Sequence, residues 1–108
     1  MQVTQFFAEI IGTLIFLLVI INLIFRSSTD PVATSGAIPV FIGLGLAVSI
    51  YITSGLGGFG HLNPVVSAVC GANGTVSVSD MSVLIIAQLI GGFLAYLLWV
   101  AMGRKDVM

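Results

Sequence analysis

Apolar residues are concentrated in three long runs, and shorter polar stretches separate them. The runs cover about residues 5–25, 37–54 and 81–102. Each approaches the roughly 20 residues that an α-helix needs to cross a hydrocarbon core of about 30 Å. Residues 26–31, Arg-Ser-Ser-Thr-Asp-Pro, form a polar loop after the first run. The pattern predicts an all-α transmembrane fold with three membrane-spanning helices.

Residues 55–71 break this pattern between the second and third runs. Four of the six residues 55–60 are glycine, and each glycine costs a helix about 1 kcal/mol relative to alanine. Asn63 is a good N-cap because its side-chain oxygen accepts an orphan backbone N–H, and Pro64 suits the first helical position. A helix from Pro64 to about Gly71 is about 12 Å long, less than half of the bilayer core. Such a re-entrant half-helix is tolerated only where it is buried in protein or lines a wet cavity, which indicates a pore or a binding site.

The composition supports an integral membrane protein. The 108 residues are 58% hydrophobic and 6% charged, with a mean hydropathy of +1.23, far from the average of soluble domains. We therefore expect one multi-pass unit over residues 1–108 with no soluble domain. Three cations make no nucleic-acid-binding surface, and a single cysteine makes no internal disulfide. No Lys or Arg precedes the first run and no small-residue cleavage site follows it, so we interpret it as a retained span rather than a signal peptide.

Glu9 and Gln88 are polar residues inside the predicted spans, and each has two interpretations. An ionisable side chain at membrane depth is a functional site by default, here for a proton or a substrate. Alternatively, both side chains support the irregular backbone of residues 57–60, whose N–H groups need acceptors. We favour loop support, and we expect His61 to be a packed loop residue rather than a proton relay. Because His61 has no Cys or His partner, we expect no metal site, and nothing indicates a cofactor.

Small residues recur one helical turn apart in each predicted span. The pairs are Ala8 and Gly12, Gly43 and Ala47, and Gly91 and Ala95. Such pairs allow helices to approach closely in lipid, where van der Waals contact replaces the hydrophobic drive. The alternative is chance, because Gly and Ala are common in membrane spans. We expect Gly12, Gly43 and Gly91 to lie at helix contacts.

Four segments follow one another along the chain in a particular order and spacing. They are Ala8-Glu9-Ile10-Ile11-Gly12-Thr13, Gly43-Leu44-Gly45-Leu46-Ala47, His61-Leu62-Asn63-Pro64-Val65-Val66-Ser67 and Gln88-Leu89-Ile90-Gly91-Gly92. Together they resemble the aquaporin family, also called major intrinsic proteins, over nearly the whole chain. The joint pattern is far more specific than an Asn-Pro dipeptide. It is closest to the glycerol-conducting branch, through residues 43–47 and 50–53, and it implies a passive channel rather than an enzyme.

The resemblance covers only the first of the family's two inverted repeats, each of which has three spans and one half-helix. One half-helix reaches only about half-way through the bilayer, so three spans and one half-helix leave the other half without a half-helix. The simplest source of a second half-helix is an inverted copy of the chain. We therefore expect an antiparallel homodimer, and the family's tetramers of complete pores imply eight chains in the bilayer.

The charges bear on orientation. Arg26 follows the first span, and Arg104 and Lys105 follow the third, so all three cations lie on one face. The positive-inside rule then favours an outside N-terminus by only three charges, whereas the family's first repeat has its N-terminus inside. We interpret this small bias as compatible with both orientations, and a heterodimer with a separate second-half protein remains an alternative. Trp99, just before the two terminal cations, matches the order of an aromatic belt and snorkelling cations.

The resemblance implies that Asn63-Pro64-Val65 is the pore motif and that two such motifs meet at the midplane. Each half-helix N-terminus carries roughly half a positive charge, which repels cations and protons. With its oxygen engaged as a cap, the Asn63 amide offers N–H donors to a water or alcohol oxygen. The acceptors leading to this point are the backbone carbonyls of Phe59, Gly60, His61 and Leu62.

Several positions depart from the family. Val65 replaces the usual alanine after Asn-Pro, and Val66 stands where the second repeat has an arginine at the selectivity mouth. Ile42 stands where the second span usually supplies an aromatic residue, and a partner chain adds Ile50 or Tyr51. The predicted mouth is therefore apolar, and the preference among water, glycerol and other small neutral solutes stays open.

Two other functions stay open at this point. A small multidrug-resistance type antiporter has a similar length, an antiparallel dimer and a first-span glutamate, but four full spans and no half-helix. A non-conducting structural or heteromeric subunit is the second alternative, against which the intact pore motif argues.

Overall fold

The computed structural model describes residues 1–25 and 29–103, and this part of the chain is helical with no strand. Its helices are α1 (Val3–Ile24), α2 (Pro31–Thr34), α3 (Ile38–Gly55), α4 (Pro64–Ala72) and α5 (Val78–Ala101). α1, α3 and α5 are each long and apolar enough to cross a membrane. This confirms the three predicted spans. The cations on which the orientation prediction rests, Arg26, Arg104 and Lys105, lie outside the described residues.

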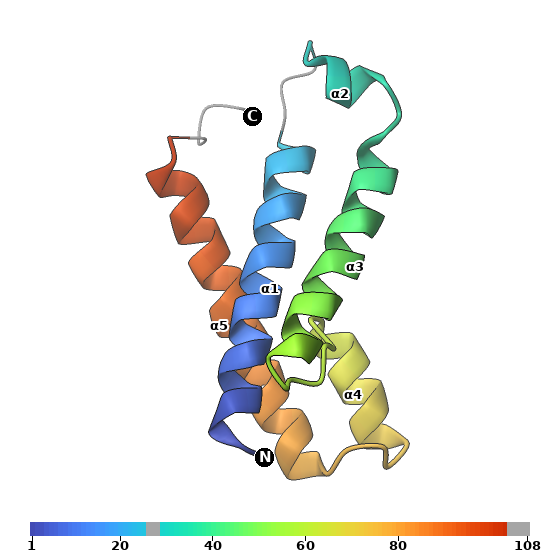
Figure 1. Cartoon of the computed structure of the whole chain (residues 1–108), viewed down its shortest axis with the longest axis vertical. Helices are drawn as coiled ribbons and strands as arrows, with labels where there is room; N and C mark the ends of the chain where they lie inside the picture. Colours follow the sequence, from blue (N-terminus) through green and yellow to red (C-terminus); the bar gives the residue numbers. More distant parts are fainter. Residues whose placement is uncertain (26–28, 104–108) are drawn as a thin grey trace.

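α1 is the central span, with α3 on one side of it and α5 on the other (Figure 1). α3 runs in the opposite direction to α1 and α5. α4 packs against α5 at the end of the molecule that also holds the N-terminus and the loop of residues 56–63. We call this the α4 end, and the opposite end, which holds α2, the α2 end.

α2 was not predicted, although its start uses the same local signal as the half-helix. The Asp30 carboxylate accepts the N–H of Val32 at 2.8 Å, and Pro31 occupies the first helical turn. This is the Asn63-Pro64 arrangement with a different cap residue. The sequence carries this signal at Asp30 and Pro31, at the end of the stretch predicted as a loop.

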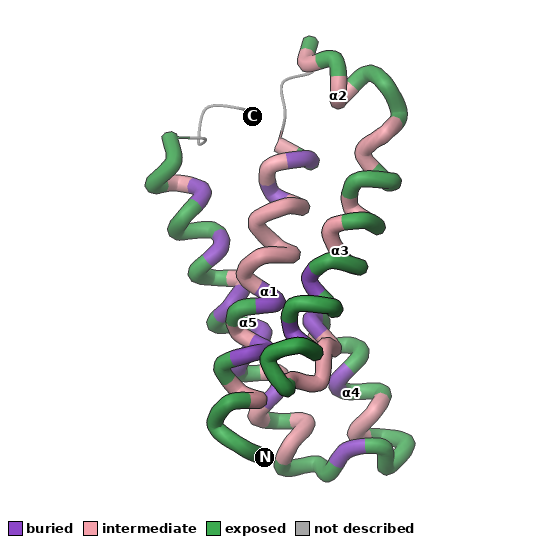
Figure 2. Tube along the Cα trace, in the orientation of Figure 1, coloured by how far each residue is buried: buried purple, intermediate pink, exposed green. Residues whose placement is uncertain are grey.

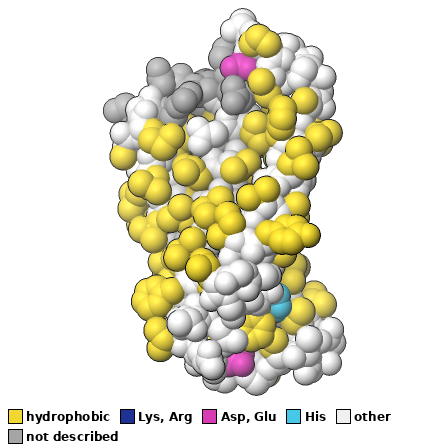
Figure 3. Space-filling model, in the orientation of Figure 1, with side chains coloured by type: hydrophobic (Ala, Val, Ile, Leu, Met, Phe, Trp, Pro, Cys, Tyr) yellow, Lys and Arg dark blue, Asp and Glu magenta, His cyan; other side chains and the backbone are white. Residues whose placement is uncertain are grey.

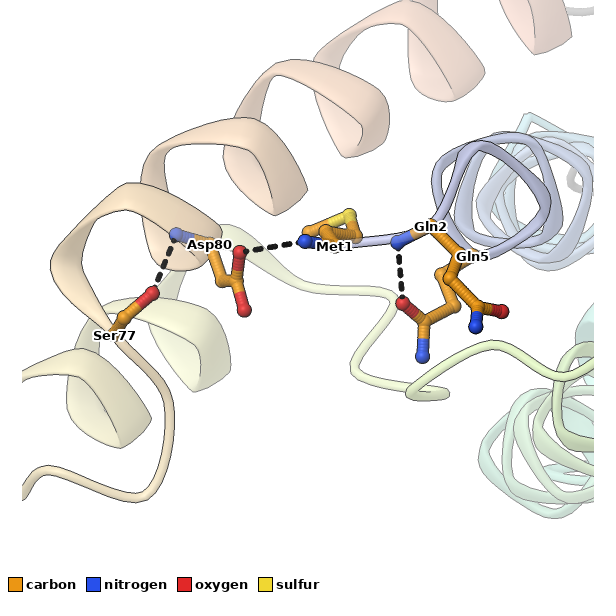
Figure 4. A network of polar contacts seen from close by, with 5 residues as sticks. All are labelled: Met1, Gln2, Gln5, Ser77 and Asp80. Atoms are coloured by element: carbon orange, nitrogen blue, oxygen red, sulfur yellow. Dashed lines mark hydrogen bonds and ion pairs between the residues drawn. The ribbon is translucent and has the colours of Figure 1, made fainter.

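α5 begins three residues earlier than predicted because Ser77 caps it. The Ser77 hydroxyl accepts the N–H of Asp80 at 3.0 Å, and the Asp80 carboxylate lies 3.4 Å from the Met1 ammonium (Figure 4). Next to this ion pair the Gln2 N–H donates to Gln5 Oε1 at 2.8 Å. The ion pair joins the starts of α1 and α5 at the α4 end, and the two hydrogen bonds are local to each start.

Gly12 and Gly91 lie where the spans nearly touch. A Cβ on Gly91 would lie 2.6 Å from the carbonyl oxygen of Ile10 in α1. A Cβ on Gly12 would overlap the Thr53 hydroxyl of α3. Glycine is therefore required at position 91 by the α1 backbone and at position 12 by the Thr53 side chain, as expected of small residues at membrane helix contacts.

Gly43 does not make the contact that was predicted for it within the chain. It is exposed, and no atom lies within 4 Å of where its Cβ would be. The contact of α3 with α1 is made two residues later, where a Cβ on Gly45 would lie 2.8 Å from Val19. The reason is helical geometry: two residues turn about 200° around the helix axis, so Gly43 and Gly45 face opposite sides.

Trp99 is buried rather than part of an interfacial belt. Its exposed fraction is 5%, and it packs with Ile21 and Ala95 in the apolar core at the α2 end. Its ring centroid lies 5.3 Å from that of Phe25. Sequence position alone suggested a lipid-facing aromatic residue, but the contact between α1 and α5 encloses the ring.

α3 is the least covered of the three spans. Ser49 and Thr53 are its only buried residues, and most of its length is exposed in Figure 2. Hydrophobic side chains cover much of the face shown in Figure 3, and the acidic side chains visible there lie near the two ends. This is the distribution of an integral, multi-pass membrane protein, with an apolar band between polar ends.

Candidate functional site

The half-helix starts as the local sequence predicts. Asn63 has an extended backbone, with φ −152° and ψ 124°, and its Oδ1 accepts the N–H of Val65 at 2.8 Å. Pro64 occupies the first turn, and α4 has nine residues, or about 14 Å of helix. The N-terminal end of α4 is the end nearer the middle of the molecule (Figure 1). Asn63 is exposed there, at the tip of a positive helix end.

The loop before α4 is held in an unusual backbone conformation. Gly57 and Gly60 have positive φ angles of 88° and 74°, which glycine adopts without strain. Leu62 also has a positive φ, 57°, although such a conformation is uncommon for a residue with a Cβ. Its side chain is 2% exposed. Burial of Leu62 and hydrogen bonds to its neighbours offset the local strain, which keeps one conformation of the loop.

Glu9 supplies most of those hydrogen bonds. Its side chain is fully buried, and its two oxygens accept the N–H of Gly60 at 3.1 Å and the N–H of Leu62 at 2.6 Å. The oxygen that binds Leu62 also accepts from the Gln88 amide at 3.1 Å. The structure thus brings together Glu9, Gln88 and the loop across separations of 51 to 79 residues in sequence. A buried carboxylate that accepts three hydrogen bonds is a firm anchor.

Ser67 belongs to the same network, and sequence reasoning assigned it no role. It is fully buried on α4, one helical turn after Asn63. Its hydroxyl accepts from Gln88 Nε2 at 2.8 Å and lies 2.9 Å from His61 Nδ1. The available signal was its spacing, because a serine at that position of α4 faces the same side as the cap. Its partners could not be read from the sequence.

Small residues give the network its space. A Cβ on Gly58 would lie 2.8 Å from both Ala8 and Thr53, and Gly12 faces Thr53 and Leu62. The Thr53 hydroxyl donates back to the Ser49 carbonyl of its own helix at 2.7 Å. The two glycines therefore leave the space that the Thr53 and Leu62 side chains occupy where α1, α3 and the loop meet.

The residues predicted at the pore mouth lie on different sides of their helices. Ile50 is next to the loop, since its Cγ2 lies 3.5 Å from where a Cβ on Gly60 would be. Tyr51 projects elsewhere and is 81% exposed, the largest exposed fraction among the large hydrophobic side chains of residues 1–25 and 29–103. Ile42 is half-buried. It lies on the opposite side of α3 from Tyr51, because nine helical residues make two full turns and about half a turn more. Val65 and Val66 are exposed on α4.

The α2 end contains an apolar groove rather than a polar network. Its volume is about 530 Å³, and it lies between α1, α2 and α3. It is lined by Ile15, Leu18, Val19, Asn22, Leu23, Val32 and Phe41. The polar side chain among them, Asn22, donates to its own helix at the Leu18 carbonyl at 2.8 Å. Nothing in this groove resembles the arrangement around Glu9.

In the described part of the chain, no three of the His, Cys, Asp and Glu side chains lie together as a metal site would require. The described residues also form three spans and two short helices, α2 and α4, whereas the antiporter alternative requires four full spans. That alternative is therefore wrong.

A model of the family described as Major intrinsic protein matches residues 1–106 of the chain. Searches of curated proteins and of solved structures found no match. Members of the matched family are membrane channels rather than enzymes, and water or small solutes are what they conduct. The family match, the three apolar helices and the Asn63-capped half-helix agree, and the chain belongs to the major intrinsic protein family.

Proposed function

We propose that this chain forms a passive pore for water and small neutral solutes such as glycerol, and that two inverted copies complete it. The observation that carries the proposal is the position of α4. Its capped N-terminus lies nearer the middle of the molecule, the helix occupies only the α4 end, and Glu9 and Gln88 hold the preceding loop. The described residues provide no second half-helix at the α2 end.

An inverted copy supplies the missing half. Its own α4 enters from the opposite face, so the two helix N-termini and the two Asn63 side chains meet at the midplane. Two helix ends of the same sign there create a positive potential that opposes cations and protons. The exposed length of α3 also favours a partner, because this span buries only Ser49 and Thr53 within the chain.

Neutral solutes are selected by donors and acceptors in the path. Asn63 Oδ1 is engaged by Val65, so the amide nitrogen is the free hydrogen-bonding group of that side chain. The carbonyls of residues 59–62 supply acceptors, and their orientation follows from the N–H bonds to Glu9 on the other side of the loop. Water and alcohols both donate and accept hydrogen bonds, so they match the Asn63 N–H donors and the carbonyl acceptors of the loop.

The mouth of such a pore is apolar. Ile42 of one chain, near its α2 end, faces Ile50 and Val66 of its inverted partner, and no arginine narrows the opening. We assign Ile50 rather than Tyr51 of the partner to the mouth, because Ile50 lies beside Gly60. Tyr51 then points outward, where it contacts lipid or a neighbouring pore in an assembly of four pores and eight chains.

The test is a stopped-flow swelling assay on proteoliposomes that contain only the purified 108-residue chain. We expect water and glycerol to permeate faster than through empty vesicles. Permeation no faster than in empty vesicles would contradict a homomeric channel and would favour the non-conducting or heteromeric subunit.

Cysteine crosslinking tests the inverted arrangement in a Cys70→Ser background. Ser79 lies at the α4 end and Thr34 at the α2 end, and both are exposed. We expect Ser79→Cys to crosslink with Thr34→Cys and not with itself. Crosslinks only between two copies of Ser79→Cys would show a parallel pair and refute the proposal.

A further inference from the structure

We propose that Ser67 is a positioning residue that holds the His61 imidazole as its Nε2–H tautomer. His61 then presents a hydrogen-bond donor beside the backbone acceptors of the loop. The effect on conduction rests on the proposed pore, whereas the tautomer follows from contacts within one chain.

The Glu9 carboxylate sets the orientation of the Gln88 amide. A carboxylate only accepts hydrogen bonds, so the Gln88 atom 3.1 Å from Glu9 Oε1 is the amide nitrogen. The opposite assignment would place the amide oxygen against an acceptor that already binds the Leu62 N–H. The same nitrogen lies 2.8 Å from the Ser67 hydroxyl oxygen. Gln88 is therefore the donor to Ser67.

The direction of the next bond follows from burial. Ser67 is 0% exposed, and among the described residues its hydroxyl has two partners, Gln88 Nε2 and His61 Nδ1. If Ser67 accepted from both, its own proton would be buried without an acceptor, which native structures avoid. The Ser67 hydroxyl therefore donates to His61 Nδ1. A neutral imidazole that accepts at Nδ1 carries its proton at Nε2.

The outcome is a directed chain of hydrogen bonds from α1 through α5 and α4 to the loop. Its outer member, His61, is half-buried, and its ring packs at 5.5 Å between centroids against Phe59. The carbonyls of the loop are all acceptors, so the Nε2–H adds a side-chain donor to that part of the path. This donor matches the oxygen of water or of a hydroxylated solute, and a solute that lacks an acceptor gains nothing from it.

Nitrogen-15 NMR of the full chain in lipid bilayers tests the tautomer directly. His61 is the one histidine of the sequence, so its two ring nitrogens need no assignment among several residues. At neutral pH we expect Nε2 in the protonated range and Nδ1 in the unprotonated range. The Nε2–H form should exceed the other by about two- to tenfold, the ratio that one net hydrogen bond supports. An Nδ1–H form or an imidazolium in the wild-type chain would overturn the proposal.

Variants test whether Ser67 determines the tautomer of His61. Ser67→Ala should produce a mixture of tautomers and slow glycerol permeation, and Ser67→Thr, which keeps the hydroxyl, should restore both. The matched control is Ser82→Ala, because the exposed Ser82 hydroxyl bonds only to its own helix, at the Val78 carbonyl at 2.9 Å. An unchanged tautomer ratio in Ser67→Ala would refute the role of Ser67.

Gln88→Met provides a second route if Ser67→Ala does not fold. Without the Gln88 donor, Ser67 is free either to donate or to accept, so the tautomer ratio should fall, and an unchanged ratio would contradict the directed chain. The NMR result also separates this proposal from the pore. A single Nε2–H tautomer in a chain that conducts nothing would refute the channel and leave the role of Ser67 standing.

Discussion

The two ends of the molecule are built in different ways although the same three spans cross both. At the α4 end, Glu9, Gln88 and Ser67 are buried and hydrogen-bonded to one another. At the α2 end, Trp99 and its neighbours form an apolar core beside an open groove of about 530 Å³. Directional hydrogen bonds specify a single geometry, whereas apolar contacts accept several.

This difference separates what one chain provides by itself from what an inverted copy adds in the proposed pore. Glu9, Gln88 and Ser67 hold the loop and the start of the half-helix from within the chain, so these hydrogen bonds do not need a second copy. The groove and the exposed face of α3 have no such cover. Substitutions of the same chemical kind at the two ends should therefore have unequal effects.

The largest expected effect is that of Glu9→Gln. It removes the charge and one acceptor from a site where Gly60, Leu62 and Gln88 all donate, which leaves at least one buried donor unpaired. We expect a loss of about 2–4 kcal/mol in the free energy of unfolding, measured by denaturation in detergent. The control is Asp80→Asn, which should cost about 1 kcal/mol or less because Asp80 is partly exposed. Equal losses would refute the assignment of Glu9 as the anchor.

Gly12→Ala should have the next largest effect. Its methyl group would overlap Thr53 and approach Leu62, so α1, α3 and the loop must separate, at a cost of about 1–3 kcal/mol. Gly43→Ala adds the same methyl group where no atom lies within 4 Å. It should not weaken folding of the single chain, and it should stabilise α3 by up to about 1 kcal/mol. Thermal unfolding of the two variants side by side checks the contrast.

Asn63→Asp should change selectivity more than stability. The carboxylate keeps the capping oxygen, and a negative charge at a helix N-terminus is favourable, so unfolding should change by less than about 1 kcal/mol. The positive potential at the proposed midplane falls, and we expect a cation leak in liposomes loaded with a potential-sensitive dye. A tight barrier to cations in this variant would show that Asn63 does not lie in the path.

The smallest effect is expected for Ile15→Phe, which extends a side chain into the open groove. We expect a change of less than about 1 kcal/mol in unfolding of the monomeric chain. Leu84→Phe, at a position with 0% exposure, should cost about 1–3 kcal/mol by overpacking. If Ile15→Phe weakens self-association without affecting the monomer, the groove is part of the contact between copies.

Much of this fold follows from local rules. Apolar runs of span length predict α1, α3 and α5, and a cap residue followed by proline predicts the start of α4. The same rule marks the start of α2 at Asp30 and Pro31, at the end of the predicted loop. These signals act over a few residues, so no knowledge of distant contacts is needed to interpret them.

The sequence by itself determined the three spans, the half-helix and its cap, and the polar residues that need partners. Tertiary structure alone decided which partners they have: Ser67 joins Gln88 to His61, Gly45 rather than Gly43 contacts α1, and Trp99 is enclosed rather than facing lipid. The physical reason is that these contacts depend on how far each helix is rotated about its axis. That rotation is set by packing between segments up to 79 residues apart, and no local pattern records it.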